Sequence, residues 1–158
     1  MSNPPAYLDW NASAPLRAEA RAAVLAALDP VGNPSSPHGE GRRVRAIVED
    51  AREQVAALVG AKPAEIVFTS GATESNNAVV AGGWQAILLA GIEHDSVLAP
   101  ARNLAHGGRR VVDLAVDDNG RVRVDDVANG AREAAAIGHA LLSLQLANNE
   151  TGVVQPVA

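Results

Sequence analysis

The spacing of apolar residues predicts two helices in the first part of the chain. Apolar side chains recur three and four residues apart over residues 15–28 and again over residues 41–59, as they do on one face of a helix. Pro15 suits the first turn of the first helix, and Ser13 is placed to cap it. Gly60 directly follows the second helix and is typical of a residue that ends one.

Beyond residue 65, short apolar runs alternate with helical segments. The runs predict strands over residues 66–68, 86–92, 109–116 and 140–146, and the segments between them predict helices over residues 73–80, 96–105 and 126–136. Nearly continuous apolar strands are typical of a parallel sheet that helices cover on both faces. The expected fold class is therefore α/β, a mainly parallel sheet flanked by helices. Residues 1–60 are expected to form an amino-terminal helical segment, and residues 61–158 the first part of a larger domain.

Polar residues follow three of the predicted strands. They lie at residues 70–74, 93–96 and 148–151. In parallel sheets, ligands bind at the carboxyl ends of the strands. We therefore expect these three segments to contribute to one site.

The stretch FTSGATESNN, residues 68–77, joins a predicted strand to a predicted helix. The free N–H groups of a helix start, the small Gly71 and the hydroxyls of Ser70 and Thr73 predict an anion site, with phosphate as the expected anion. Neither the P-loop motif nor the dinucleotide-binding motif is present. The alternative interpretation is an ordinary turn with small capping residues.

The other two polar segments also allow two interpretations each. His94 is suited to stacking on a flat ligand or moving a proton, but it also fits a loop position beside a capping Asp or Ser. The amides of Asn148 and Asn149 are suited to binding a ligand oxygen or to satisfying the backbone of a turn. No G-x-S-x-G turn accompanies His94, so a hydrolase triad is not expected.

Composition narrows the classes of partner and compartment. The formal net charge of -5 disfavours nucleic acid, which binds basic surfaces. The chain has no cysteine, which excludes disulfides and thiolate metal sites within it, and no metal site is expected. The start, MSNPPAY, lacks the features of a signal peptide, and the longest apolar run is too short to span a bilayer. We expect a cytoplasmic protein without a membrane partner.

The motifs resemble, in this order, the amino-terminal part of a cysteine desulfurase of the NifS/IscS type. The matching sequences are YLD and NASAP near the start, GNPSS at 32–36, IVFTSGATESNN at 66–77, EH at 93–94 and NNETGVVQ at 148–155. Such enzymes use pyridoxal 5'-phosphate (PLP) and belong to fold type I and the class V aminotransferase group. The resemblance thus implies PLP as cofactor and the first part of the fold type I large domain. The pairing of GNPSS with FTSGATESNN favours desulfurases over the related selenocysteine lyases.

The resemblance implies a role for particular residues. Ala72 and Thr73 would hold the PLP phosphate, and His94 would stack on the pyridine ring as the catalytic residue of this chain. Asn149 would bond the phenolic oxygen of the cofactor or lie beside the substrate. The substrate end of the cleft would take three residues, Asn11, Ala12 and Ser13.

The implied reaction converts L-cysteine to L-alanine and leaves the sulfur on the enzyme as a persulfide. That sulfur would serve iron–sulfur cluster assembly or another sulfur pathway. The partners implied are L-cysteine, a second copy of the chain or a chain that carries the missing half, and a sulfur-acceptor protein.

Two residues that this chemistry needs are missing from the sequence. There is no cysteine to carry the persulfide, and the only lysine, Lys62, lies in a polar turn where a Schiff-base lysine is not expected. The 158 residues alone are therefore predicted to be inactive, as a fragment or as half of a split enzyme. The alternatives are another class V aminotransferase or lyase, or a non-catalytic product that binds phosphate or PLP weakly.

Two local departures from the family pattern accompany the resemblance. Ser13 and Ala14 stand where the family often has two threonines, and the segment 77–93 is shorter than the resemblance leads us to expect.

Overall fold

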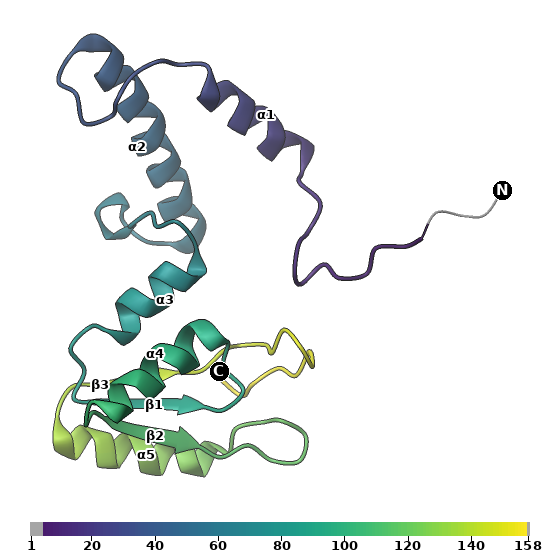
Figure 1. Cartoon of the computed structure of the whole chain (residues 1–158), viewed down its shortest axis with the longest axis vertical. Helices are drawn as coiled ribbons and strands as arrows, with labels where there is room; N and C mark the ends of the chain where they lie inside the picture. Colours follow the sequence, from purple (N-terminus) through teal and green to yellow (C-terminus); the bar gives the residue numbers. More distant parts are fainter. Residues whose placement is uncertain (1–4, 158) are drawn as a thin grey trace. The chain divides into compact units, whose positions relative to one another are not determined.

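The computed structural model describes residues 5–157. The chain forms two compact units, Met1–Phe68 and Thr69–Ala158, which are described separately. Figure 1 shows the elements of both units in chain order. Among the described residues, no helix has the length and apolar character needed to cross a membrane.

The first unit holds helix α1 (Ala18–Leu28), helix α2 (Gly39–Val59) and a short 3-10 helix, η1 (Pro63–Glu65). The prediction that Ser13 caps the first helix is wrong. The residue before α1 is Arg17, which makes no side-chain cap, while the backbone N–H of Ser13 donates to the carbonyl of Asp9 at 3.3 Å. The turn covers residues 10–12, and residues 13–17, where the spacing placed the helix start, have no regular secondary structure.

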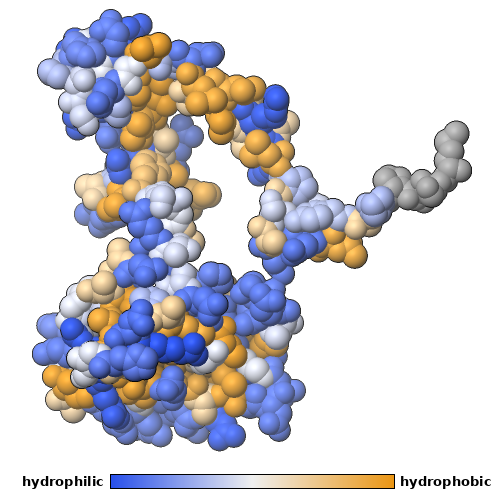
Figure 2. Space-filling view, viewed as in Figure 1, coloured by the Kyte–Doolittle hydropathy of each residue, from blue (hydrophilic) through white to orange (hydrophobic). Residues whose placement is uncertain are grey.

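Helix α2 confirms the clearest of the predicted helices. His38 begins it, because its Nδ1 accepts from the backbone N–H of Gly41 at 3.3 Å. Gly60 ends it with φ of 69°, the left-handed conformation that glycine adopts without steric cost. None of the side chains of α1 is buried within the described chain, and Figure 2 shows the apolar ones at the surface.

Residues 66–68 do not form the predicted strand. Ile66 is extended, with φ of -94° and ψ of 127°, but no backbone partner among the described residues pairs with this segment. Its carbonyl instead accepts from the Arg52 guanidinium at 2.6 Å, and the same guanidinium lies 4.9 Å from the centre of the Phe68 ring. The Arg52 side chain thus bonds the Ile66 carbonyl, which a neighbouring strand would otherwise bond in a β-ladder.

The second unit contains a parallel sheet with the strand order β2-β1-β3. Its elements are α3 (Ala72–Val80), β1 (Ala86–Ala90), α4 (Asp95–His106), β2 (Arg110–Leu114), α5 (Val124–Ile137) and β3 (Ala140–Ser143). These confirm the predicted helices and the last three predicted strands, with ends shifted by a few residues. The α/β class and the parallel sheet are therefore as expected.

The core lies on both faces of β1, whose five residues are all buried. Ile87 and Leu89 face α3 and α4, whereas Leu88 faces α5, as Figure 1 shows for the helices. Helix α5 approaches closely at Gly130, where an added Cβ would lie 2.9 Å from Cδ2 of Leu88. Both faces of the central strand are thus covered, which explains its uninterrupted apolar run.

Candidate functional site

The first turn of α3 is open as an anion site requires. Gly71 precedes the helix, and an added Cβ there would meet nothing within 4 Å. Ala72 and Thr73 are exposed, and within the described chain their backbone N–H groups have no acceptor. The start of α3 therefore offers N–H groups, the Thr73 hydroxyl and the positive end of the helix dipole.

Ser70 does not serve as the free hydroxyl donor that the sequence suggested. Its hydroxyl and its backbone N–H both donate to Oε2 of Glu74, each at 2.7 Å. These two hydrogen bonds, the one from the hydroxyl first, lower the pKa of Glu74 below its usual value. Ser70 thus shapes the turn through Glu74, and Thr73 is left as the hydroxyl for a ligand.

Replacing Ser70 with alanine is expected to raise the pKa of Glu74 towards its usual value, since the strongest of its hydrogen bonds is lost. Because the pKa of Glu74 is lowered by folding, its contribution to stability is present above the unfolded pKa and is lost as the pH falls through the folded pKa. A carboxyl ¹³C titration by NMR measures the change. A Thr69→Ala variant, which leaves Ser70 and Glu74 intact, is the control, and an unchanged Glu74 titration in Ser70→Ala would contradict the assignment.

His94 lies at the end of β1, as the residue that begins α4. Its Nδ1 accepts from the backbone N–H of Ser96 at 3.1 Å and lies 2.8 Å from the Ser96 hydroxyl. The side chain of Asn76, from α3, donates to the same hydroxyl at 2.8 Å. His94 itself thus caps α4, which differs from the expected loop position beside a capping Asp or Ser, while the residue as a whole is exposed beside a cavity.

That cavity brings together two of the predicted site residues. It has a volume of about 260 Å³ and is lined by residues 92–95 and 148–150, so His94 and Asn149 border the same space. The remaining polar lining consists of the amide of Asn148 and the acidic side chains of Glu93, Asp95 and Glu150. The predicted convergence is therefore seen for the segments after β1 and β3, whereas residues 70–74, the third predicted segment, do not line this cavity.

The two neighbouring asparagines have different tasks. Asn148 is buried; its Oδ1 accepts from the N–H groups of Glu150 and Thr151, and its Nδ2 donates to the carbonyl of Ile92 at 3.0 Å. It therefore satisfies the backbone of its turn and fastens that turn to β1. Asn149 is exposed at the cavity, and its Nδ2 donates to Glu150 at 2.8 Å.

Glu93 joins the ends of β1 and β3. The residue is 8% exposed, its Oε1 accepts from the backbone N–H of Gln145 at 2.9 Å, and its Oε2 accepts from the hydroxyl of Ser143 at 3.3 Å. The side-chain amide of Gln145 donates in return to the carbonyl of Ile92. These bonds connect the two strands beyond the last residue pair of their backbone ladder. They thereby help to set the spacing between His94 and Asn149.

The remaining predicted residues lie in the first unit. Asn11, Ala12 and Ser13 are exposed in a turn after Asp9, whose carboxylate accepts from the N–H of Ala12 at 3.4 Å. Lys62 is exposed, and its backbone N–H donates to Glu65 at 2.8 Å, as expected of a surface turn.

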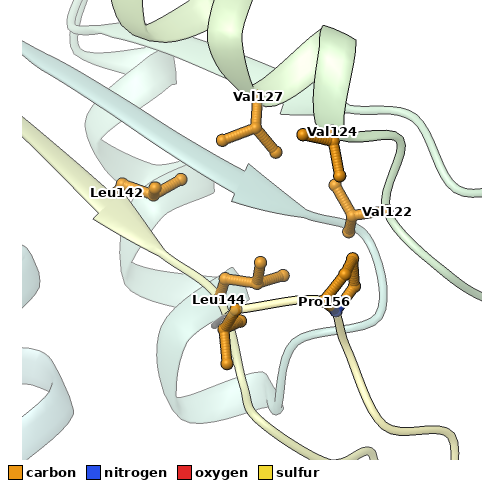
Figure 3. Close-up of a pocket in the computed structure, with 7 residues that line it drawn as sticks. Val122, Val124, Val127, Leu142, Leu144 and Pro156 are labelled. Carbon is orange, nitrogen blue, oxygen red and sulfur yellow. The ribbon is translucent and has the colours of Figure 1, made fainter.

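A second, larger cavity is apolar. It measures about 380 Å³ and lies between the start of α5 and the end of β3, with a lining of valine, leucine and proline side chains (Figure 3). Its lining residues are Val122, Val124, Val127, Leu142, Leu144, Pro156 and Val157. Without polar side chains it offers no group for chemistry, so the smaller polar cavity is the candidate site.

Reasoning from sequence placed Glu93 and Ser96 in a polar segment but did not assign the structural hydrogen bonds around the site to any residue. Ser96, Asn76 and Glu93 carry its hydrogen bonds, and Gln155, 3% exposed, accepts from the N–H of Val122 and donates to the carbonyl of Gly120. The only signal in the sequence was that polar residues follow apolar runs. That signal does not distinguish a side chain that contacts a ligand from one that hydrogen-bonds the protein itself.

Comparison with known proteins identifies the family of this chain. The family model for class V aminotransferases matches residues 6–158. A cysteine desulfurase IscS from Dictyoglomus turgidum is 40% identical over 96% of the chain, and a selenocysteine lyase from Homo sapiens is 34% identical over 96% of it. The chain spans 39% of the length of each of these relatives.

A solved structure of a NifS-like protein superposes with a TM-score of 0.81 and 34% identity, over 93% of this chain and 42% of that one. This chain thus covers less than half of each of these relatives. The relatives include desulfurases and selenocysteine lyases, so similarity alone does not separate these two activities.

Proposed function

We propose that this chain, which belongs to the class V aminotransferase family, supplies residues that bind the cofactor of a PLP-dependent cysteine desulfurase. The observation that supports this most is the pairing of an open helix N-terminus at Ala72 and Thr73 with a cavity bordered by His94 and Asn149. The reaction would convert L-cysteine to L-alanine and transfer the sulfur to a cysteine thiol outside these 158 residues.

The described residues fit PLP at both of its ends. A phosphate matches the unpaired N–H groups and the hydroxyl at the start of α3, where the helix dipole offsets negative charge. No arginine or lysine lines the cavity beside His94, so the dipole is the main positive contribution that this unit makes. A flat ring matches the exposed imidazole of His94.

A side chain of α3 links the first turns of helices α3 and α4. The side-chain amide of Asn77 donates to the carbonyl of Thr73 at 2.7 Å and lies 3.4 Å from the carbonyl of Ser96. This links the first turn of α3 with the first turn of α4. A ligand that spans both turns would therefore meet a fixed spacing.

When bound, PLP would withdraw electrons from the substrate carbon that carries the amine. In our proposal, Ala72 and Thr73 bind the phosphate, His94 stacks on the ring, and Asn149 donates to the phenolic oxygen or contacts the substrate. Asn11, Ala12 and Ser13 are proposed for the substrate end of the cleft. The lysine that would hold the cofactor lies outside this chain, because Lys62 is exposed in a surface turn.

A selenocysteine lyase is the second candidate, favoured by the human relative at 34% identity. The test is to load the full-length protein with PLP and to supply L-cysteine or L-selenocysteine separately. A desulfurase produces alanine from both substrates, whereas a selective lyase produces it from L-selenocysteine alone. Absence of alanine from either amino acid, with PLP bound, would contradict both and favour another class V reaction.

Replacing Thr73 with alanine is expected to weaken PLP binding by about 1–2 kcal/mol, roughly fivefold to thirtyfold in the dissociation constant, because a hydroxyl bond to phosphate is lost. Titration of the full-length apoprotein with PLP, followed by absorbance, measures the effect. Thr73→Ser is the matched control, since it keeps the hydroxyl and removes only the methyl group. Equal PLP affinity in Thr73→Ala and the unchanged protein would exclude Thr73 from the phosphate site.

A further inference from the structure

A chain of three side chains connects α3 to the imidazole of His94. Asn76 donates from Nδ2 to the hydroxyl oxygen of Ser96 at 2.8 Å, and this hydroxyl lies 2.8 Å from Nδ1 of His94. We propose that Ser96 and Asn76 are positioning residues that hold His94 as the tautomer with its proton on Nε2. The consequence for PLP rests on the proposed function, but the tautomer itself rests only on these contacts.

The backbone fixes the protonation of Nδ1. The N–H of Ser96 donates to Nδ1 at 3.1 Å, and a backbone N–H has no lone pair with which to accept. Nδ1 therefore presents its lone pair, and the single proton of the neutral ring is on Nε2. Protonating Nδ1 would set two donors against each other and would undo the cap of α4.

The hydroxyl of Ser96 adds a second donor to the same nitrogen. Because Nδ1 presents a lone pair, the Ser96 hydroxyl donates its proton to this nitrogen, and the Ser96 oxygen in turn accepts from Asn76. Ser96 is 7% exposed and Asn76 is half-buried, so water competes little for these bonds. Two donors on one nitrogen fix the rotation of the ring as well as its tautomer.

A ring held in this way has a restricted chemistry. Its two faces remain available for stacking, and Nε2–H is available as a hydrogen-bond donor. Its basic nitrogen is already engaged, so His94 does not accept a proton from a substrate at Nε2. The structure thus assigns His94 the roles of a stacking surface and a donor, and leaves proton abstraction to another group of the full-length protein.

The test is ¹⁵N NMR of histidine-labelled full-length protein without PLP. The chain contains four histidines, and the signal that disappears in His94→Gln identifies the residue. The ¹⁵N shifts of the unchanged protein are expected to show a protonated Nε2 and an unprotonated Nδ1. In Ser96→Ala and Asn76→Ala the backbone N–H of residue 96 still donates to Nδ1, so the same tautomer is expected, while removal or loss of support of the hydroxyl donor moves the Nδ1 shift. Ser96→Thr, which keeps the hydroxyl, is expected to retain the original pattern.

Asn77→Ala is the matched control, because Asn77 also bonds α3 to α4 but contacts only carbonyl oxygens there. Its His94 shifts are expected to equal those of the unchanged protein. A protonated Nδ1 in the unchanged protein would overturn the proposal, and so would identical shifts in Ser96→Ala. If the tautomer is as proposed but PLP does not bind, the proposed function fails while the positioning of His94 stands.

If PLP binds, Ser96→Ala is expected to raise its dissociation constant roughly threefold to tenfold, the effect of losing one hydrogen bond that orients the stacking ring. Ser96→Thr is expected to restore affinity. Tighter or equal PLP binding in Ser96→Ala would show that Ser96 does not position His94 for the cofactor.

Discussion

Replacing Leu88 with alanine is expected to lower the free energy of unfolding by about 2–5 kcal/mol. Leu88 is 1% exposed at the centre of β1 and packs beneath α5 where Gly130 allows the helix to approach. The truncation leaves a cavity that the strand, paired on both sides, cannot close. Chemical denaturation of the full-length protein, followed by circular dichroism, measures the loss.

Ile137→Ala provides the comparison for Leu88→Ala, because it removes the same number of carbons from a residue that is 47% exposed at the end of α5. Its effect is expected to stay below about 1 kcal/mol, since the removed surface is already half in water. Equal losses in the two variants would show that Leu88 is not at the centre of a close-packed core.

Glu93→Ala is expected to lower the free energy of unfolding by about 1–3 kcal/mol and to weaken PLP binding as well. The substitution leaves the backbone N–H of Gln145 and the hydroxyl of Ser143 without their shared acceptor. The end of β3 then keeps its ladder and the bonds of Gln145 and Asn148 to Ile92 but loses the bonds to Glu93, so the spacing between Asn149 and His94 is held less firmly. Denaturation and a PLP titration of the same preparation measure both effects.

Glu93→Gln separates the loss of hydrogen bonds from the loss of charge. Its side-chain oxygen still accepts from Gln145, so stability and PLP affinity are expected to lie close to those of the unchanged protein. Were Glu93→Gln as damaging as Glu93→Ala, the negative charge and not the brace between strands would be the important property.

The sequence predicted the central sheet well because its signal is strong and local. β1 is buried on both faces, and a strand in that environment must be apolar throughout, as residues 86–90 are. Residues 66–68 have a similar composition but no strand partner in the described chain, so the same signal led to a wrong prediction there. Pairing is a property of two segments, and apolar content in one of them does not establish it.

The site was predictable in outline for a different reason. Polar residues after buried strands necessarily gather at one edge of a parallel sheet, which brought His94 and Asn149 to one cavity. Which neighbour bonds the backbone and which faces the cavity depends on single hydrogen bonds, as Asn148 and Asn149 show. Spacing carries no information on that choice, and the assignment of Ser70 to a ligand was wrong for the same reason.

The brace at Glu93 has a consequence for how this edge opens. The amide proton of Gln145 is held by a side chain, whereas strand amides are held by the ladder. One rotation of the Glu93 carboxylate releases that proton, so its exchange with solvent deuterium requires no separation of β1 from β3. The amide of Gln145 should therefore exchange faster than the amides inside the ladder. Its exchange rate would measure local opening at the edge of the cavity while β1 and β3 remain paired.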